Sequence, residues 1–250
     1  RPSFITITRS ACSASFMWTK HLKLKAFTLA EVLITLGIIG VVAAMTLPAL
    51  INNKQNKELE VLLIKNYSIL QQALLTIYNE EGQPITAKNY NREQVGSLLR
   101  KNIKDLSYCN NCGAAFEDNG NNSSVYTING YRTLHGTKLH ANYFDDLILE
   151  FKDGRRLFIE RPTQSSTYDE FDNFWMTIDI NGYKKKPNRL GIDFFTFMVM
   201  PNGKLLPMGS EETRFSEEEY CSVNSTSNIN GIGCTYKALS EKDYFKNLPK

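Results

Sequence analysis

The hydrophobic pattern of the chain changes near residue 51, and each half of the pattern predicts a different kind of helix. From Val32 to Ile51, twenty consecutive residues carry no charge. As a helix with a rise of about 1.5 Å per residue, this stretch is roughly 30 Å long, the thickness of a bilayer core. Beyond it, apolar residues recur in steps of three and four. They are Leu59, Leu63, Tyr67, Leu70, Leu74 and Ile77.

Together the two patterns predict one helix of about fifty-five residues. Its segment 27–51 would span a membrane, and its amphipathic segment 52–81 would pack on a domain. Gly82 and Pro84 end the helical pattern. An interior proline removes one helix hydrogen bond and clashes with the carbonyl four residues back. We therefore expect a bend or local melting at Pro48.

Basic residues precede the apolar run and set its expected orientation. Residues 1–26 carry five basic residues and no acid, so the positive-inside rule places the N-terminus in the cytoplasm. The whole chain has 29 basic and 26 acidic residues. Without this segment the net charge becomes −2, and no nucleic-acid partner is expected. Met17 is followed by a compact basic stretch, so we expect 1–26 to be a leader whose translation starts at Met17, with residues 1–16 upstream.

Glu31 stands at the head of the apolar run. A carboxylate at membrane depth is costly and usually has a partner. In one interpretation, Glu31 only marks the membrane interface. In the other, the chain is cut before Phe27, and the new α-amino group pairs with the Glu31 of a neighbouring subunit. In this second interpretation Glu31 has no partner within its own chain before cleavage.

The run from Lys25 to Ile34, Lys-Ala-Phe-Thr-Leu-Ala-Glu-Val-Leu-Ile, resembles the prepilin cleavage and methylation motif of type IV pilins and type II secretion pseudopilins. The resemblance implies cutting between Ala26 and Phe27 by a prepilin peptidase, followed by N-methylation of Phe27. Family members usually have glycine before the cut, so Ala26 departs from the pattern. They commonly have a proline at the position of Pro48, where helix melting helps packing in the filament.

The resemblance also implies partners and a location. The partners are prepilin peptidase, other pilin or pseudopilin subunits, and an inner-membrane assembly platform. The chain would cross the inner membrane once, with a periplasmic or extracellular head domain, and enter a filament after assembly. We thus expect a structural subunit, a pseudopilin or minor pilin of a type IV pilus or type II secretion-like filament, and not an enzyme.

A rival interpretation makes the chain an extracytoplasmic binding module with a simple membrane anchor or a secretory signal. The sequence Val42-Ala-Ala44 fits signal cleavage after Ala44. Against a signal, the apolar region is long and has Glu31 at its head. Such cleavage would also leave Pro48 and the amphipathic helix as an unexplained N-terminus.

Residues 82–250 predict an α+β head domain. A short helix is expected at Arg92–Ile103 and an Asn/Gly-rich loop at Glu117–Ser124. Tight turns at 152–154 and 201–203 require antiparallel pairing of their flanking strands. The expected strands are Val125–Ile128, Leu147–Phe151, Arg155–Glu160, Phe174–Ile180, Phe194–Met200 and Lys204–Pro207. The antiparallel sheet would bury the amphipathic face of the long helix, in a pilin-like arrangement.

A second resemblance lies between Thr177 and Phe195. Its pattern, Asp-x-Asn-Gly, Pro-Asn and Gly-x-Asp-x-Phe, is similar to a segment of many pseudopilin-like proteins. Some relatives bind calcium near the sheet, and Asp179, Asn181 and Asp193 offer oxygen ligands that suit calcium. The spacing does not fit an EF-hand loop. The alternative is ordinary turn hydrogen bonding, in which case no cofactor is expected.

Four cysteines follow the helix, namely Cys109, Cys112, Cys221 and Cys234. An even count in a domain outside the cytoplasm favours two disulfides, and we expect the pairs 109–112 and 221–234. The second pair resembles the disulfide-bounded loop of many pilins. Zinc binding is an alternative, although the second pair is too widely spaced for a zinc knuckle. The three histidines accompany no nucleophile elbow, phosphate loop or paired metal-ligand motif.

Overall fold

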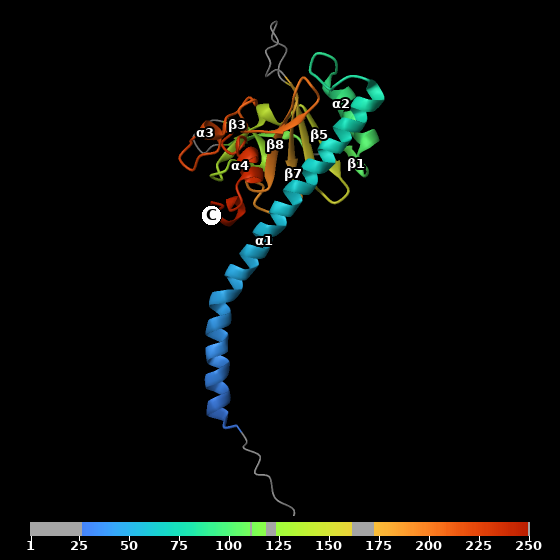
Figure 1. Ribbon diagram of the computed structural model, residues 1–250. Coiled ribbons are helices and arrows are strands. Elements are labelled where there is room, and N and C mark those ends of the chain that lie inside the picture. The colour runs from blue at the N-terminus through green and yellow to red at the C-terminus, as the bar shows by residue number, and fades with distance from the viewer. Residues whose placement is uncertain (1–26, 111, 119–123, 162–172, 250) are drawn as a thin grey trace, which may run out of the picture. The chain divides into compact units, whose positions relative to one another are not determined.

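The computed structural model describes residues 27–110, 112–118, 124–161 and 173–249. The chain divides into two compact units, residues 1–48 and residues 49–250. One long helix, α1 (Leu29–Glu81), contributes to both units (Figure 1). Each unit is described separately below.

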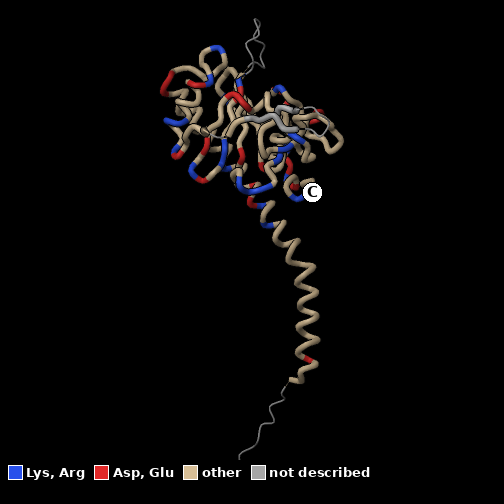
Figure 2. Tube along the Cα trace, turned by 180° about the vertical axis from the view of Figure 1, so that it is seen from behind, with Lys and Arg blue, Asp and Glu red and all other residues tan. Residues whose placement is uncertain are grey.

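In the first unit, the described residues form an exposed apolar helix. Leu33 and Ile39 are 61% and 63% exposed, and the trace of this stretch is mostly tan in Figure 2, the colour of residues other than Lys, Arg, Asp and Glu. The helix is long and apolar enough to cross a membrane, and none of its apolar window is buried. It passes through Pro48 without interruption. Local melting at Pro48 is therefore absent from this structure.

In the second unit, α1 packs on the domain through the face that the sequence pattern predicted. Leu63, Leu70, Leu74 and Ile77 are buried, and Leu59 and Tyr67 are partly buried against the same core. The helix ends at Gly82, which adopts a left-handed φ of 71° and donates its N–H to the Tyr78 carbonyl at 2.9 Å. Glycine is the residue that takes this conformation without a steric penalty.

The domain is built on a six-stranded antiparallel sheet in the order β1-β5-β6-β7-β8-β9. Its strands are β1 (Leu106–Tyr108), β5 (Leu147–Phe151), β6 (Arg156–Glu160), β7 (Trp175–Asp179), β8 (Phe194–Val199) and β9 (Leu205–Pro207). The helix α2 (Arg92–Asn102) begins with a capping box between Asn91 and Gln94. The predicted α+β class and antiparallel pairing are confirmed.

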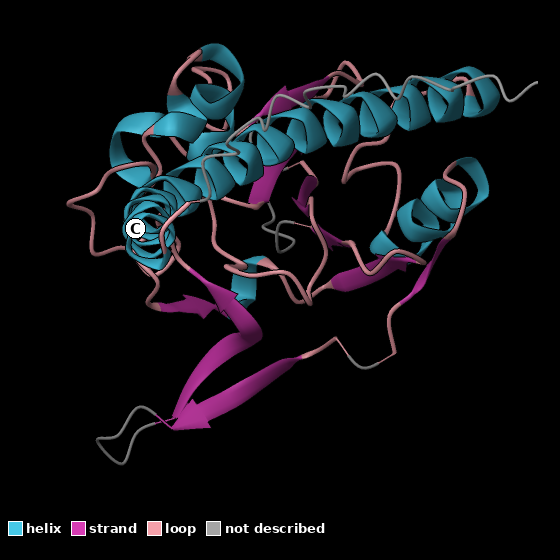
Figure 3. Ribbon diagram, turned by 90° about the horizontal axis from the view of Figure 1, so that it is seen from below, coloured by secondary structure: helices cyan, strands magenta, loops and turns pink. Residues whose placement is uncertain are grey.

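Both faces of this sheet are buried. Successive side chains along a strand point to opposite faces, and each face packs against its own hydrophobic core. On β8, Phe195 and Phe197 share a core with α1, whereas Phe194 and Met198 belong to the core on the opposite face. That second core includes Ile128 and Leu139 of a three-stranded sheet. This sheet consists of β2 (Ala114–Asp118), β3 (Ser124–Arg132) and β4 (Lys138–His140). Figure 3 shows α1 lying across the strands of the domain.

Short elements complete the domain. They are η1 (Ala141–Tyr143), α3 (Glu217–Tyr220), α4 (Cys234–Ser240) and η2 (Tyr244–Lys246). The expected loop Glu117–Ser124 is partly wrong, because β2 extends to Asp118 and pairs there with Ser124 of β3. Pairing along these strands satisfies backbone groups that a loop would leave to water. Residues 119–123 lie outside the described residues.

Candidate functional site

The N-terminal end of α1 holds the residues expected in processing and assembly. Ala26 lies outside the described residues, and Phe27 is 84% exposed. The Glu31 carboxylate accepts hydrogen bonds from the backbone N–H and the hydroxyl of Thr28, both at 2.8 Å. The Glu31 N–H donates to the Thr28 hydroxyl at 3.2 Å. This reciprocal arrangement is a capping box.

The Glu31 carboxylate therefore has hydrogen-bond donors within its own chain, while the expectation that its charge has no partner there stays a prediction. Thr28 supplies two hydrogen-bond donors to the carboxylate. However, a hydroxyl and an amide carry no net charge, so the negative charge of Glu31 remains uncompensated by Thr28. The carboxylate is thus held in place at the helix start, where the helix dipole also favours a negative group.

A second cluster lies where β7 ends and β8 begins. Asp179, the last residue of β7, pairs with Phe194, the first residue of β8. Asp193 therefore lies beside Asp179, and both side chains are fully buried. The loop 180–193 leaves and re-enters the sheet between these two carboxylates. The structure thus brings together the residues that the sequence singled out in this segment.

Hydrogen bonds fix Asp179 on both of its oxygens. One oxygen accepts the Gly182 N–H at 2.8 Å, and the other accepts the Tyr131 hydroxyl at 2.8 Å. Burial disfavours the charged carboxylate and raises the pKa of Asp179 to about 7, and the charge of Asp193 adds to this rise. The hydrogen bond from Tyr131 acts in the opposite direction, because it stabilises the ionised form.

Asp193 closes the other end of the loop. Its carboxylate accepts the backbone N–H groups of Arg189 at 2.7 Å and Asn188 at 2.9 Å, and the Asn181 amide nitrogen at 3.2 Å. Burial raises the pKa of Asp193 to about 6, although these donors favour its charged form and lower it. The described hydrogen bonds therefore reach all four carboxylate oxygens of the pair.

This arrangement fits a hydrogen-bonded loop better than a calcium site. Calcium takes six to eight oxygen ligands, yet Asn181 presents its nitrogen to Asp193 rather than its oxygen. Two buried amide oxygens, Oδ1 of Asn181 and Oδ1 of Asn188, have no hydrogen-bond partner among the described residues. The hydrogen bonds account for the carboxylates of Asp179 and Asp193 without an ion, but not for the amide oxygen of Asn181, and calcium binding stays a prediction.

The cysteines lie together in the two expected pairs. Cys109 and Cys112 have their Cα atoms 5.7 Å apart, and Cys221 and Cys234 have theirs 4.8 Å apart, both within disulfide range. Among the described residues, the Glu150 carboxylate also lies within 4.8 Å of the first pair of sulfurs. The second pair is not part of that group, so the described residues do not gather the four cysteines around one zinc ion.

No protein-family model, no curated protein sequence and no solved structure matches this chain.

Proposed function

We propose that the chain is a structural subunit, a pseudopilin or minor pilin, of a type IV pilus or type II secretion-like filament. The observation that carries the proposal is that the two parts of α1 have different surroundings. Its first part exposes a continuous apolar surface, and its second part is docked on a disulfide-paired head domain. A helix of this kind needs apolar surroundings outside its own chain.

A bilayer satisfies that need before assembly. The run 32–51 contains eleven Leu, Ile and Val residues, each contributing about −0.3 to −0.6 kcal/mol to insertion. Their sum of about −5 kcal/mol exceeds the cost of about 3 kcal/mol for a carboxylate at the helix centre. Glu31 lies at the helix start, where the cost is smaller. Insertion therefore remains favourable with the charge in place.

Neighbouring copies of the helix satisfy the same need in a filament. A Cβ added at Gly37 or Gly40 would meet nothing within 4 Å in this chain, so both positions are open to a partner helix. Small residues let helix backbones approach closely in the membrane. The charge of Glu31, which pairs with no cation among the described residues, provides the complementary feature, since cleavage before Phe27 creates an α-amino group that can pair with it in another subunit.

The proposal is tested by expressing the chain with a prepilin peptidase and an assembly platform. Processing should shorten the chain, and filaments sheared from the cells should contain it by immunoblotting and electron microscopy. A cleaved chain that stays in the membrane fraction or is secreted as a monomer under these conditions contradicts the filament role. That second outcome favours an extracytoplasmic binding module.

A further inference from the structure

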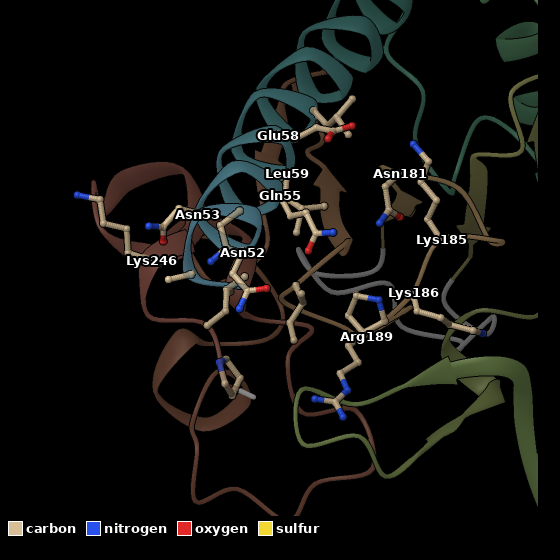
Figure 4. Close-up of a pocket in the computed structure, with 17 residues that line it drawn as sticks. Asn52, Asn53, Gln55, Glu58, Leu59, Asn181, Lys185, Lys186, Arg189 and Lys246 are labelled. Carbon is tan, nitrogen blue, oxygen red and sulfur yellow. The ribbon is translucent and has the colours of Figure 1, made fainter. Parts of the chain in front are cut away.

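A groove of about 870 Å³ opens in the second unit, where three distant segments of the chain meet. They are the residues of α1 from Ala49 on, the loop between β7 and β8, and the residues near the C-terminus. Figure 4 shows Lys185 and Lys186 on the loop side of the groove and Asn52 on the helix side. Arg189 and Leu248 also line it.

The rim of the groove is cationic. Lys185 and Lys186 are exposed and form no ion pair with any described residue. Lys246 also lines the groove, but Asp243 pairs with it at 2.6 Å. The acidic residue among the lining side chains is Glu58. The two lysines of the loop therefore leave positive charge without a described counter-ion.

Apolar side chains form one part of the groove lining, which we call its apolar floor, and amide side chains that include Asn52 and Asn56 line the rest. Leu59, Leu62 and Leu248 are partly buried against the core and face the groove, together with Ile192. A cationic rim above an apolar floor matches a ligand with an anionic group attached to an apolar body. A free inorganic anion would use only the rim.

The groove also begins close to the end of the apolar run. Ile51 is the last residue of that run, and Ala49, Asn52 and Asn56 line the groove. At about 1.5 Å per residue, the distance from Ile51 to Asn56 along the helix is roughly 7 Å. The polar headgroup layer of one leaflet is about 5–7 Å thick. With the apolar run in the hydrocarbon core, the first turns of the groove lie at headgroup depth.

We propose that this groove binds an anionic phospholipid of the leaflet that faces the head domain. Lys185 and Lys186 bind the phosphate of the headgroup, and the apolar floor contacts the glycerol and the first methylenes of the acyl chains. The contact would hold the base of the head domain at the membrane before assembly. It requires insertion of α1 but not polymerisation, so it goes beyond the subunit role and can fail independently of it.

The test uses the full chain in detergent, titrated with phosphatidylglycerol or phosphatidylcholine and followed by native mass spectrometry. Phosphatidylglycerol should bind at least tenfold more tightly. Anionic surfaces attract each nearby lysine by about 1 kcal/mol, so K185Q/K186Q should raise the Kd for phosphatidylglycerol by about tenfold to thirtyfold. The matched control K88Q/K204Q removes two exposed lysines elsewhere on the head domain and should change that Kd by less than twofold.

Four results would overturn the proposal. Equal binding of the two lipids would show that the headgroup charge is not recognised. Equal losses in the two double variants would show that net charge, and not the groove, attracts the lipid. Loss of lipid binding in 10 mM inorganic phosphate would identify a site for free anions. Retention of lipid only in dimers of the chain would identify a second copy as the occupant of the groove.

Discussion

Glu31 has two separable roles in this account, and two conservative substitutions separate them. Glu31→Gln keeps a side chain that can close a capping box but removes the negative charge. Thr28→Ala keeps the charge but removes the hydroxyl that bonds Glu31 in both directions. We expect Glu31→Gln to stop filament assembly and Thr28→Ala to leave it largely intact.

The magnitudes follow from the geometry of the helix start. Loss of an N-cap hydroxyl costs about 1 kcal/mol, and α1 has 53 residues, so Thr28→Ala affects only the first turn. This corresponds to less than a tenfold change in assembly. A carboxylate and an α-amino group about 4 Å apart interact by about 4 kcal/mol at an effective dielectric constant of 20. Removing that charge therefore reduces subunit addition about a thousandfold.

The assay compares sheared filaments with cell-associated protein by quantitative immunoblotting for the two variants and the wild-type chain. Membrane fractionation shows whether each variant inserts, and chain length shows whether each is cleaved. The reasoning is refuted if both are processed and inserted but Thr28→Ala loses its filaments while Glu31→Gln keeps them. Glu31 would then act as a helix cap and not as a charged partner.

The head domain supports further predictions. Tyr131→Phe keeps the ring but removes the hydrogen-bond donor to Asp179. In urea unfolding, the free energy of unfolding should fall by about 1 kcal/mol at pH 5 and by about 2 kcal/mol at pH 8, where the Asp179 carboxylate is ionised. Tyr67→Phe, whose hydroxyl bonds a backbone carbonyl, is the control, and an equal pH dependence in both variants would contradict this reasoning. The wild-type head should lose stability as the pH rises from about 4 through 7. The pKa of Asp179 is about 7 in the folded chain and about 3.9 in the unfolded chain, so the folded chain binds the proton more tightly. A gain of stability over this range would refute burial as the cause of the raised pKa. Replacing both Cys221 and Cys234 by serine should lower the free energy of unfolding by about 3 kcal/mol, and an unchanged value would argue against the disulfide. Millimolar calcium separates the two interpretations of the loop between Asp179 and Asp193. A hydrogen-bonded loop without an ion leaves the thermal midpoint of the head unchanged, whereas a rise of several degrees would establish a calcium site.

The long helix and most strands could be predicted because their signals are local. The spacing of Leu63, Leu70 and Ile77 is a property of one segment, and so is the Gly82 that ends it. The second covered face of the sheet was missed although a signal existed. The strand 194–199 is almost uninterruptedly apolar, and such a run is typical of a strand buried on both faces.

The candidate functional residues also divide into those with a local sequence signal and those without one. The capping box could have been found from Thr28 and Glu31, since a threonine three residues before a glutamate is its sequence signature. The hydrogen bond from Tyr131 to Asp179 joins residues 48 positions apart, and no local pattern predicts that contact. The groove is still harder to predict from the sequence, because Asn52, Lys185 and Leu248 meet only through the packing of the whole domain.

The central claim is tested most directly by mass spectrometry of the N-terminus of the mature chain. The chain should be purified from membranes of cells that contain a prepilin peptidase. The account predicts Phe27 as the first residue, carrying one N-methyl group. A mature chain that begins at Met45, or one that retains its leader, would contradict it.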